Sequence, residues 1–184
     1  MPGDDTVWRS KGRHRPPHLY VGGITHMVTA ATVAHAPFLA LAHRKDYLLK
    51  ALQEACAAAG TEILAWVILD THYHLVAVPQ TPPPDVAAAL VHLHRRSAAE
   101  FNREDGTPGR PVWHSHWDRR LFTEGDLYSR IINYIHRNPV KHGYVSDPGD
   151  WAWSSFRAFA ALGNPRIVEG LRRFPAPRRL PGDD

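Results

Sequence analysis

Two apolar runs separated by two polar residues constrain the fold of this chain more than any other feature. Residues 63–69 and 72–78 flank the pair Asp70-Thr71. Short apolar runs rich in Ile, Val and Leu around a two-residue connection predict a β-hairpin, although Asp-Thr is a weaker turn signal than Asp-Gly. The hairpin places these two strands side by side in a sheet.

The second run begins with two histidines one residue apart, in the order His72-Tyr73-His74. Since alternate side chains of a strand share a face, both imidazoles point the same way, roughly 7 Å apart along the backbone. That arrangement suits two ligands of one divalent metal ion. Taken alone, the pair also fits two polar residues on a solvated face, and His114-Ser115-His116 has the same spacing. One of the two pairs is expected to be a decoy.

Further strands and helices are predicted on both sides of the hairpin from hydrophobic periodicity, capping residues and prolines. In chain order, the predicted elements are a strand that begins near Ile24, a helix over 46–59, the hairpin, a helix over 85–101 capped by Asp85, a strand over 112–122, and a helix that opens with a capping box at 123–126 and ends at Pro139.

This order predicts an α+β protein with a ferredoxin-like or palm-like sandwich, in which helices pack on a central, mainly antiparallel sheet. A chain of 184 residues is long enough for one domain with a real core. We predict a basic flexible arm over residues 1–17, one folded domain over 18–160, and a tail rich in Arg and Pro over 161–184.

Composition excludes some classes of protein and leaves others open. The net charge of +4 is compatible with a nucleic-acid partner but does not establish one. Cys56 is the single cysteine, so no intrachain disulfide forms, and its Ala-rich surroundings predict an inert buried thiol. No apolar run has the length of a membrane span, and the first residues lack the apolar core of a signal peptide. A cytoplasmic protein is therefore expected.

The third predicted helix carries a tyrosine and an asparagine four residues apart, Tyr134 and Asn138, hence on one face. At 100° per residue Asn138 falls within the inward apolar stripe, Tyr134 lies at its edge, and His136 points outward. An amide directed at the sheet one turn from a phenol is unexpected for simple core packing. Two simpler explanations stay open: Asn138 satisfies its own backbone before Pro139, and Tyr134 is an amphipathic residue at the edge of the core.

The segment from Tyr134 to Gly143, Tyr-Ile-His-Arg-Asn-Pro-Val-Lys-His-Gly, resembles the signature of the REP-associated tyrosine transposases, a branch of the HUH single-strand endonucleases. Other matches occur in the right order over about residues 20–160. They are the strand His26-Met27-Val28-Thr29-Ala30, the His72-Tyr73-His74 strand, the Trp-containing stretch over 113–121, and Trp151-Ala152-Trp153-Ser154-Ser155.

The chain departs from the family pattern at three places near the histidine pair. Leu69-Asp70-Thr71 stands where the family usually has Met-Pro-Asn, and Ala31-Thr32 stands where an arginine is common. Tyr73 is bulkier than the usual aliphatic residue between the histidines, but it is apolar enough to pack. These differences bear on DNA sequence preference and activity level more than on the core chemistry.

The resemblance implies a mechanism and a ligand set. His72 and His74 would bind Mg²⁺ or Mn²⁺, with Asn138 as a third ligand. Tyr134 would attack a phosphate of single-stranded DNA, near a hairpin, and form a 5′-phosphotyrosine with a free 3′-OH. A phenol with an ordinary pKa of about 10 is mostly un-ionised at neutral pH, and a nearby cation would favour the ionised form that attacks. The covalent bond would let a 3′-OH rejoin the DNA without ATP.

Basic side chains along the chain fit the same substrate, because they can contact phosphates. The candidates are Arg95, Arg96, Arg13, Arg15, Arg119 and Arg120. Each can equally be solvated surface charge, and Trp151 and Trp153 are expected to be core anchors rather than base-stacking platforms.

Two other functions stay open: a nucleic-acid-binding protein of the same fold without catalysis, and an unrelated metal phosphodiesterase that uses water. The sequence does not decide between a monomer and a homodimer.

Overall fold

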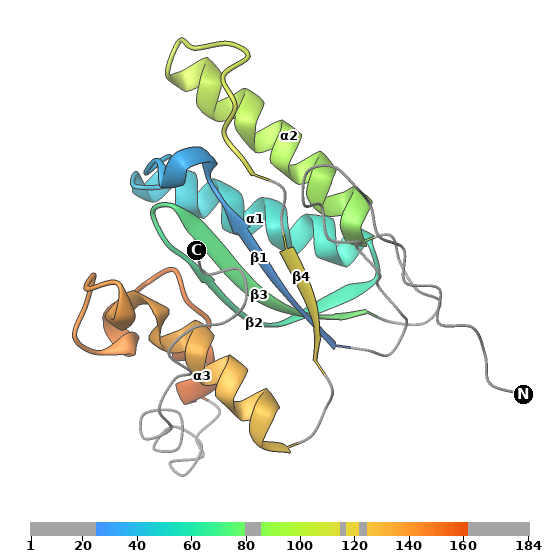
Figure 1. Cartoon of the computed structure of the whole chain (residues 1–184), viewed down its shortest axis with the longest axis vertical. Coiled ribbons are helices and arrows are strands. Elements are labelled where there is room, and N and C mark those ends of the chain that lie inside the picture. Colours follow the sequence, from blue (N-terminus) through green and yellow to red (C-terminus); the bar gives the residue numbers. More distant parts are fainter. Residues whose placement is uncertain (1–24, 80–85, 115–116, 122–124, 162–184) are drawn as a thin grey trace, which may run out of the picture.

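The computed structural model describes residues 25–79, 86–114, 117–121 and 125–161 (Figure 1). Most of the predicted arm and tail lie outside these ranges. The elements in chain order are β1 (Thr25–Ala31), η1 (Val33–His35), α1 (Ala42–Ala58), β2 (Thr61–Ile68), β3 (His72–Pro79), α2 (Val86–Glu104), β4 (Trp117–Leu121), α3 (Gly125–Lys141), η2 (Pro148–Asp150) and α4 (Phe156–Ala161). In these ranges, no helix has the length and apolar character needed to cross a membrane.

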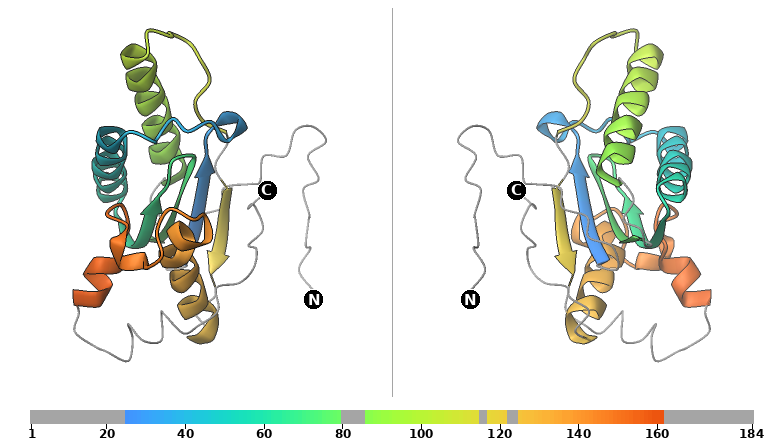
Figure 2. Two further views of the ribbon diagram at one scale, coloured as in Figure 1. Left: turned by 90° about the vertical axis from the view of Figure 1, so that its left-hand side faces the viewer. Right: turned by 90° about the vertical axis from the view of Figure 1, so that its right-hand side faces the viewer.

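The strands form one four-stranded sheet in the order β2-β3-β1-β4, and every neighbouring pair is antiparallel. Helices α1 and α2 cover one face of the sheet and α3 packs against the other (Figures 1 and 2). The predicted α+β sandwich with an antiparallel sheet is therefore confirmed. The strand order is that of a ferredoxin-like unit to which α3 has been added.

The predicted hairpin is β2 and β3, joined by the two residues Asp70 and Thr71. Its last ladder bond runs from the Leu69 N–H to the His72 carbonyl, at 2.8 Å. Asp70 also forms an ion pair with the buried Lys45 ammonium on α1, 2.7 Å away. This long-range contact supplements the weak local turn signal and fixes the start of β3.

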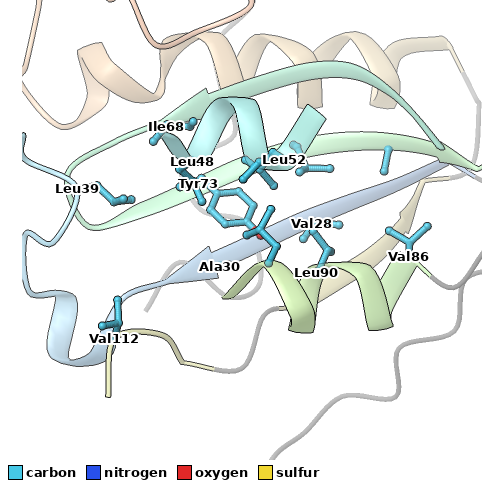
Figure 3. Packing of buried hydrophobic residues seen from close by; sticks show 14 of the residues in the cluster. Val28, Ala30, Leu39, Leu48, Leu52, Ile68, Tyr73, Val86, Leu90 and Val112 are labelled. Carbon is cyan, nitrogen blue, oxygen red and sulfur yellow. The ribbon is translucent and has the colours of Figure 1, made fainter. Parts of the chain in front are cut away.

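Alternation along β3 divides its side chains between two cores. Leu75, Ala77 and Tyr73 are fully buried against α1 and α2, and Figure 3 shows Tyr73 in this core. Val76 instead packs with residues of α3. Each fully buried leucine contributes roughly 2 kcal/mol relative to an exposed one, so this packing holds the strand register firmly. His72 and His74 share the face of Val76 and therefore point towards α3.

Two predicted helix ends are corrected by the structure. Helix α1 begins at Ala42, four residues before the predicted start, and α2 continues to Glu104 rather than ending at Phe101. Ion pairs account for both extensions: Arg44 Nε lies 2.8 Å from Glu104 Oε2, and Arg44 also pairs with Asp105. In the sequence these charged residues resemble parts of loops. In the structure, ion pairs with residues far along the chain stabilise them as helix. The predicted Asp85 cap lies outside the described residues.

The strand predicted over 112–122 is shorter in the structure. Only Trp117–Leu121 pairs as β4, beside β1, while Trp113 makes an isolated bridge to Thr32. Val112 is buried in the core next to α1 and α2 without belonging to a strand. The residues just before β4 are apolar because they form a buried connecting segment. Hydrophobic periodicity alone does not distinguish such a segment from a strand.

Pro139 does not end the third helix, contrary to the prediction. Helix α3 passes through it to Lys141. The stop is Gly143, whose positive φ of 75° closes a Schellman motif: its N–H donates to the Val140 carbonyl at 3.0 Å and the Tyr144 N–H donates to the Pro139 carbonyl at 2.9 Å. A proline this close to the end costs the helix one hydrogen bond without stopping it. The predicted capping box begins outside the described residues.

His136 is buried, not outward-facing as predicted, because the segment after α3 folds over it. Its ring contacts Phe156 and Phe159, and its Nε2 lies 2.8 Å from Ser155 Oγ. The Ser155 hydroxyl oxygen accepts from the Trp66 backbone N–H of β2 at 2.9 Å. Burial lowers the pKa of His136 from 6.5 to about 4. This neutral imidazole ties α3 to the sheet through one serine.

Trp151 and Trp153 lie half-buried against the two cores, in line with the anchoring role expected from the sequence. The Trp151 indole N–H donates to the Ile68 carbonyl at 3.0 Å, and the Trp153 indole N–H donates to Asp46 Oδ1 at 2.8 Å. Cys56 is buried as predicted, and burial raises the pKa of its thiol to about 11. A thiol of that kind is inert at neutral pH.

The buried His136 predicts how stability depends on pH. Its pKa is about 4 in the folded protein against 6.5 in the unfolded chain, so the unfolded chain binds the extra proton first as pH falls. The stability from this group is complete above 6.5 and is lost as pH falls from 6.5 towards 4. We expect the free energy of unfolding to drop by about 3 kcal/mol across this window, measured by urea denaturation in metal-free buffer.

His136→Gln removes the titrating imidazole and places an amide near Ser155, so the unfolding free energy of this variant should depend less steeply on pH in that window. His92→Gln, at an exposed histidine on α2, is the matched control and should keep the wild-type dependence. Equal pH dependence in wild type and His136→Gln would contradict the prediction.

Candidate active site

The two histidines of β3 and the asparagine of α3 meet at one place. The ring centroids of His72 and His74 are 5.0 Å apart, and His72 Nε2 lies 3.3 Å from Asn138 Oδ1. Asn138 is fully buried, and its Nδ2 has no hydrogen-bond partner within the described ranges. A buried, half-satisfied amide is unusual in simple packing. Two imidazoles and an amide oxygen together fit a divalent cation.

Two threonine hydroxyls hold the imidazoles from behind. Thr29 Oγ1 lies 2.8 Å from His74 Nδ1, and Thr71 Oγ1 lies 2.9 Å from His72 Nδ1. When each Nδ1–H donates to its hydroxyl, each Nε2 presents a lone pair for a metal ion, as hydrogen-bond partners of metal-binding histidines commonly arrange. Thr29 faces His74 directly across the β1–β3 ladder. Sequence reasoning gave neither threonine a role. The contact of Thr29 depends on the strand register, which is not visible in the sequence, whereas Thr71 directly precedes His72 in the chain.

The predicted nucleophile lies beside these donors. Tyr134 is only 1% exposed, and its ring packs edge-on against His74, with centroids 5.4 Å apart. The Lys141 ammonium donates to the Tyr134 hydroxyl at 3.3 Å and sits 5.0 Å from the ring centroid. The structure therefore brings together all four residues for which the sequence predicted a catalytic or metal-binding role.

A cavity of about 260 Å³ opens onto the histidine pair. It is lined by Thr29, Ala31, His35, Thr71, His72, His74, Lys141 and His142. Besides the two threonines, sequence reasoning missed three polar members of this lining: His35, Lys141 and His142. His35 follows Ala34 in η1, and both have positive φ, 50° and 54°, a backbone conformation that L-residues rarely adopt. Such strain is common where a functional site fixes the backbone.

Tyr73 explains how a bulky residue fits between the histidines. It points away from them into the α1–α2 core, where its hydroxyl lies 2.9 Å from His94 Nε2. The His94 ring stacks on Trp113 at 4.7 Å, and the Trp113 indole N–H donates to Ser97 Oγ at 2.9 Å. This chain of contacts couples β3 to α2, and it confirms that Tyr73 packs.

The rival pair is described only in part. His114 is exposed, its Nε2 accepts from the Ala34 N–H at 3.3 Å, and Ser115-His116 lies outside the described residues. Within those residues, no three His, Cys, Asp or Glu side chains form a metal-binding group. The Asn138 amide lies beside the histidine pair, with its Oδ1 at 3.3 Å from His72 Nε2.

Of the six basic residues proposed for DNA contact, the structure describes the side chains of two, Arg95 and Arg96, and these lie away from the histidine pair. Arg95 and Arg96 are exposed on α2, which covers the face of the sheet opposite to the histidines. Arg119 and Arg120 lie in β4, next to β1, and nothing is described of their side chains. Arg13 and Arg15 lie outside the described residues.

No family model matches the chain. A curated REP-associated tyrosine transposase from Escherichia coli is 30% identical over 103 residues, which cover 55% of this chain and 58% of that relative. A second curated relative, from Haemophilus influenzae, carries the same family name and is 29% identical over 120 residues, 58% of this chain and 65% of its own length. The matched part thus spans less than two thirds of either relative.

The solved structure of a REP-associated tyrosine transposase bound to a REP hairpin superposes with a TM-score of 0.69. The match covers 91% of this chain and 99% of that one, at 24% identity, and therefore shows the shared fold. These findings confirm the resemblance drawn from the sequence motifs. The chain is a relative of curated REP-associated tyrosine transposases and has the fold of a solved one.

Proposed function

We propose that this chain is a single-strand DNA transesterase of the REP-associated tyrosine transposase type, which cuts near a hairpin through a 5′-phosphotyrosine intermediate. The observation that carries the proposal is the meeting of Tyr134 with His74 and of Asn138 with His72, from a helix and a strand far apart in the sequence. The names of the curated relatives support it. A hairpin-forming DNA partner is supported by the solved relative, which is bound to a REP hairpin.

The residues of the site would divide the reaction between them. The Tyr134 oxygen forms a bond to phosphorus while the bond from phosphorus to O3′ breaks, which leaves a 5′-phosphotyrosine and a free 3′-OH. His72, His74 and Asn138 would hold Mg²⁺ or Mn²⁺, an ion that polarises the scissile phosphate and offsets charge on its oxygens. Thr29 and Thr71 orient the two imidazoles.

Because the covalent bond preserves the energy of the phosphodiester, a 3′-OH can attack it and rejoin the strand without ATP. The buried position of Tyr134 also limits competing attack by water on the intermediate. A cytoplasmic location belongs to the same proposal, since the DNA that such an enzyme acts on is found there.

The metal part of the proposal predicts graded effects on Mn²⁺ binding, measured by electron paramagnetic resonance of the free ion. Thr29→Val removes the hydroxyl beside His74 and should weaken binding about 10–100-fold, the usual effect of an outer-shell change. His72→Ala removes a ligand and should weaken binding more than that. His114→Ala, in the rival pair, is the control and should leave binding nearly unchanged. If His114→Ala alone strongly weakened Mn²⁺ binding, the metal site would lie at the His114 pair instead.

The nucleophile part predicts a covalent adduct. We would incubate the protein with Mn²⁺ and a 5′-unlabelled, 3′-labelled hairpin-bearing DNA strand and separate the products on a denaturing protein gel. Wild type should give a labelled protein band, and Tyr134→Phe should abolish it because the attacking oxygen is gone. Tyr144→Phe, at a more exposed tyrosine of the following turn, should keep the band.

The same experiment separates the alternatives. Cleavage that survives Tyr134→Phe and leaves no adduct would identify a water-using phosphodiesterase. Hairpin binding by wild type without cleavage or adduct would identify a nucleic-acid-binding protein of the same fold.

A further inference from the structure

Lys141 is an exposed residue, yet its ammonium contacts the buried Tyr134. It is the last residue of α3, seven residues and about two turns after Tyr134, so both residues lie on the same side of the helix. Long helical side chains lean towards the helix N-terminus, which brings the ammonium back to the tyrosine. The Nζ atom donates to the Tyr134 hydroxyl at 3.3 Å, and Lys141 also lines the cavity at the histidine pair.

A lysine in the last turn of a helix has a common explanation, because its charge complements the helix dipole. That explanation does not specify a partner, and an exposed lysine gains little by holding one geometry. Here the ammonium contacts both the hydroxyl and the ring face of a tyrosine that is buried beside a candidate ligand. The Lys141 ammonium therefore contacts the Tyr134 oxygen, which is the nucleophile of the proposed reaction.

We propose that Lys141 is a catalytic residue of this transesterification, an inference that rests on the proposed function. As Tyr134 attacks, its proton passes to solvent, the Tyr134 oxygen bonds to phosphorus, the bond from phosphorus to O3′ breaks, and O3′ takes a proton from solvent. The positive charge of Lys141 stabilises the negative charge on the phenol oxygen. In the rejoining reaction the same oxygen is the leaving group, and the same cation stabilises it.

The positive charge of Lys141 has an alternative role, which is non-specific attraction to DNA phosphates. Such a contact would act on hairpin affinity and its salt dependence, not on the rate of a bound complex. A charge that acts on the phenol oxygen would instead change the rate constants of both cleavage and rejoining in the bound complex, and would leave hairpin affinity nearly unchanged.

The test compares full-length wild type, Lys141→Met, Lys141→Arg and Arg130→Met. Arg130 is an exposed cation on the same helix, one turn before Tyr134, and serves as the matched control for loss of one positive charge. For each protein, the single-turnover rate of adduct formation at saturating hairpin DNA is measured with Mg²⁺, and hairpin affinity is measured separately in EDTA. Rejoining is followed by adding an excess of a strand with a free 3′-OH to the isolated adduct.

Lys141→Met should lower both the cleavage and rejoining rates about 100-fold, the usual effect of losing one charge-stabilising donor, while hairpin affinity changes less than about threefold. Lys141→Arg should recover most of both rates, and Arg130→Met should keep them. A Met variant that does not fold would be replaced by Lys141→Gln, with thermal unfolding as the check.

Unchanged rates in folded Lys141→Met, or a loss confined to hairpin affinity, would overturn this inference while the proposed function stands. Absence of any adduct from wild type would overturn both.

Discussion

The two-residue periodicity of β3 within the antiparallel sheet is the constraint on which the candidate site depends. Tyr73, Leu75 and Ala77 must face the α1–α2 core, because each is fully buried there. The histidines therefore take the other face. A slip of one residue would drive the imidazoles into an apolar core and expose the apolar set, so the packing energy of the core also fixes the position of the ligands.

The other half of the site depends on how α3 is held. The helix is buried on more than one side, which is why His136 is as inaccessible as Tyr134 and Asn138 although it projects away from their shared face. His136 joins the helix to Ser155 and, through it, to the backbone of β2. Polar groups buried in this way are costly unless they find partners, so such contacts specify one placement of the helix. Tyr134 and Asn138 are set against β3 as a result.

A site divided between a strand and a helix also explains how the departures from the family pattern are accommodated. Asp70, in place of a proline before the first histidine, gains an ion pair with Lys45, whose ammonium is 4.8 Å from the Trp153 ring centroid. Thr71 supplies the hydroxyl beside His72. Tyr73 fills space towards α2 through His94. Asp70 and Tyr73 make these contacts away from the cavity, whereas Thr71 and Ala31 are among the residues that line it.

The sequence by itself determined the hairpin, the shared face of His72 and His74, and the shared face of Tyr134 and Asn138, because these follow from local periods of two and 3.6 residues. Only the tertiary structure decided which contacts form across the sheet and between strand and helix. Thr29 meets His74 over 45 residues of chain and His72 meets Asn138 over 66. The burial of His136 likewise depends on what packs against α3, and a local pattern contains no information about that neighbour.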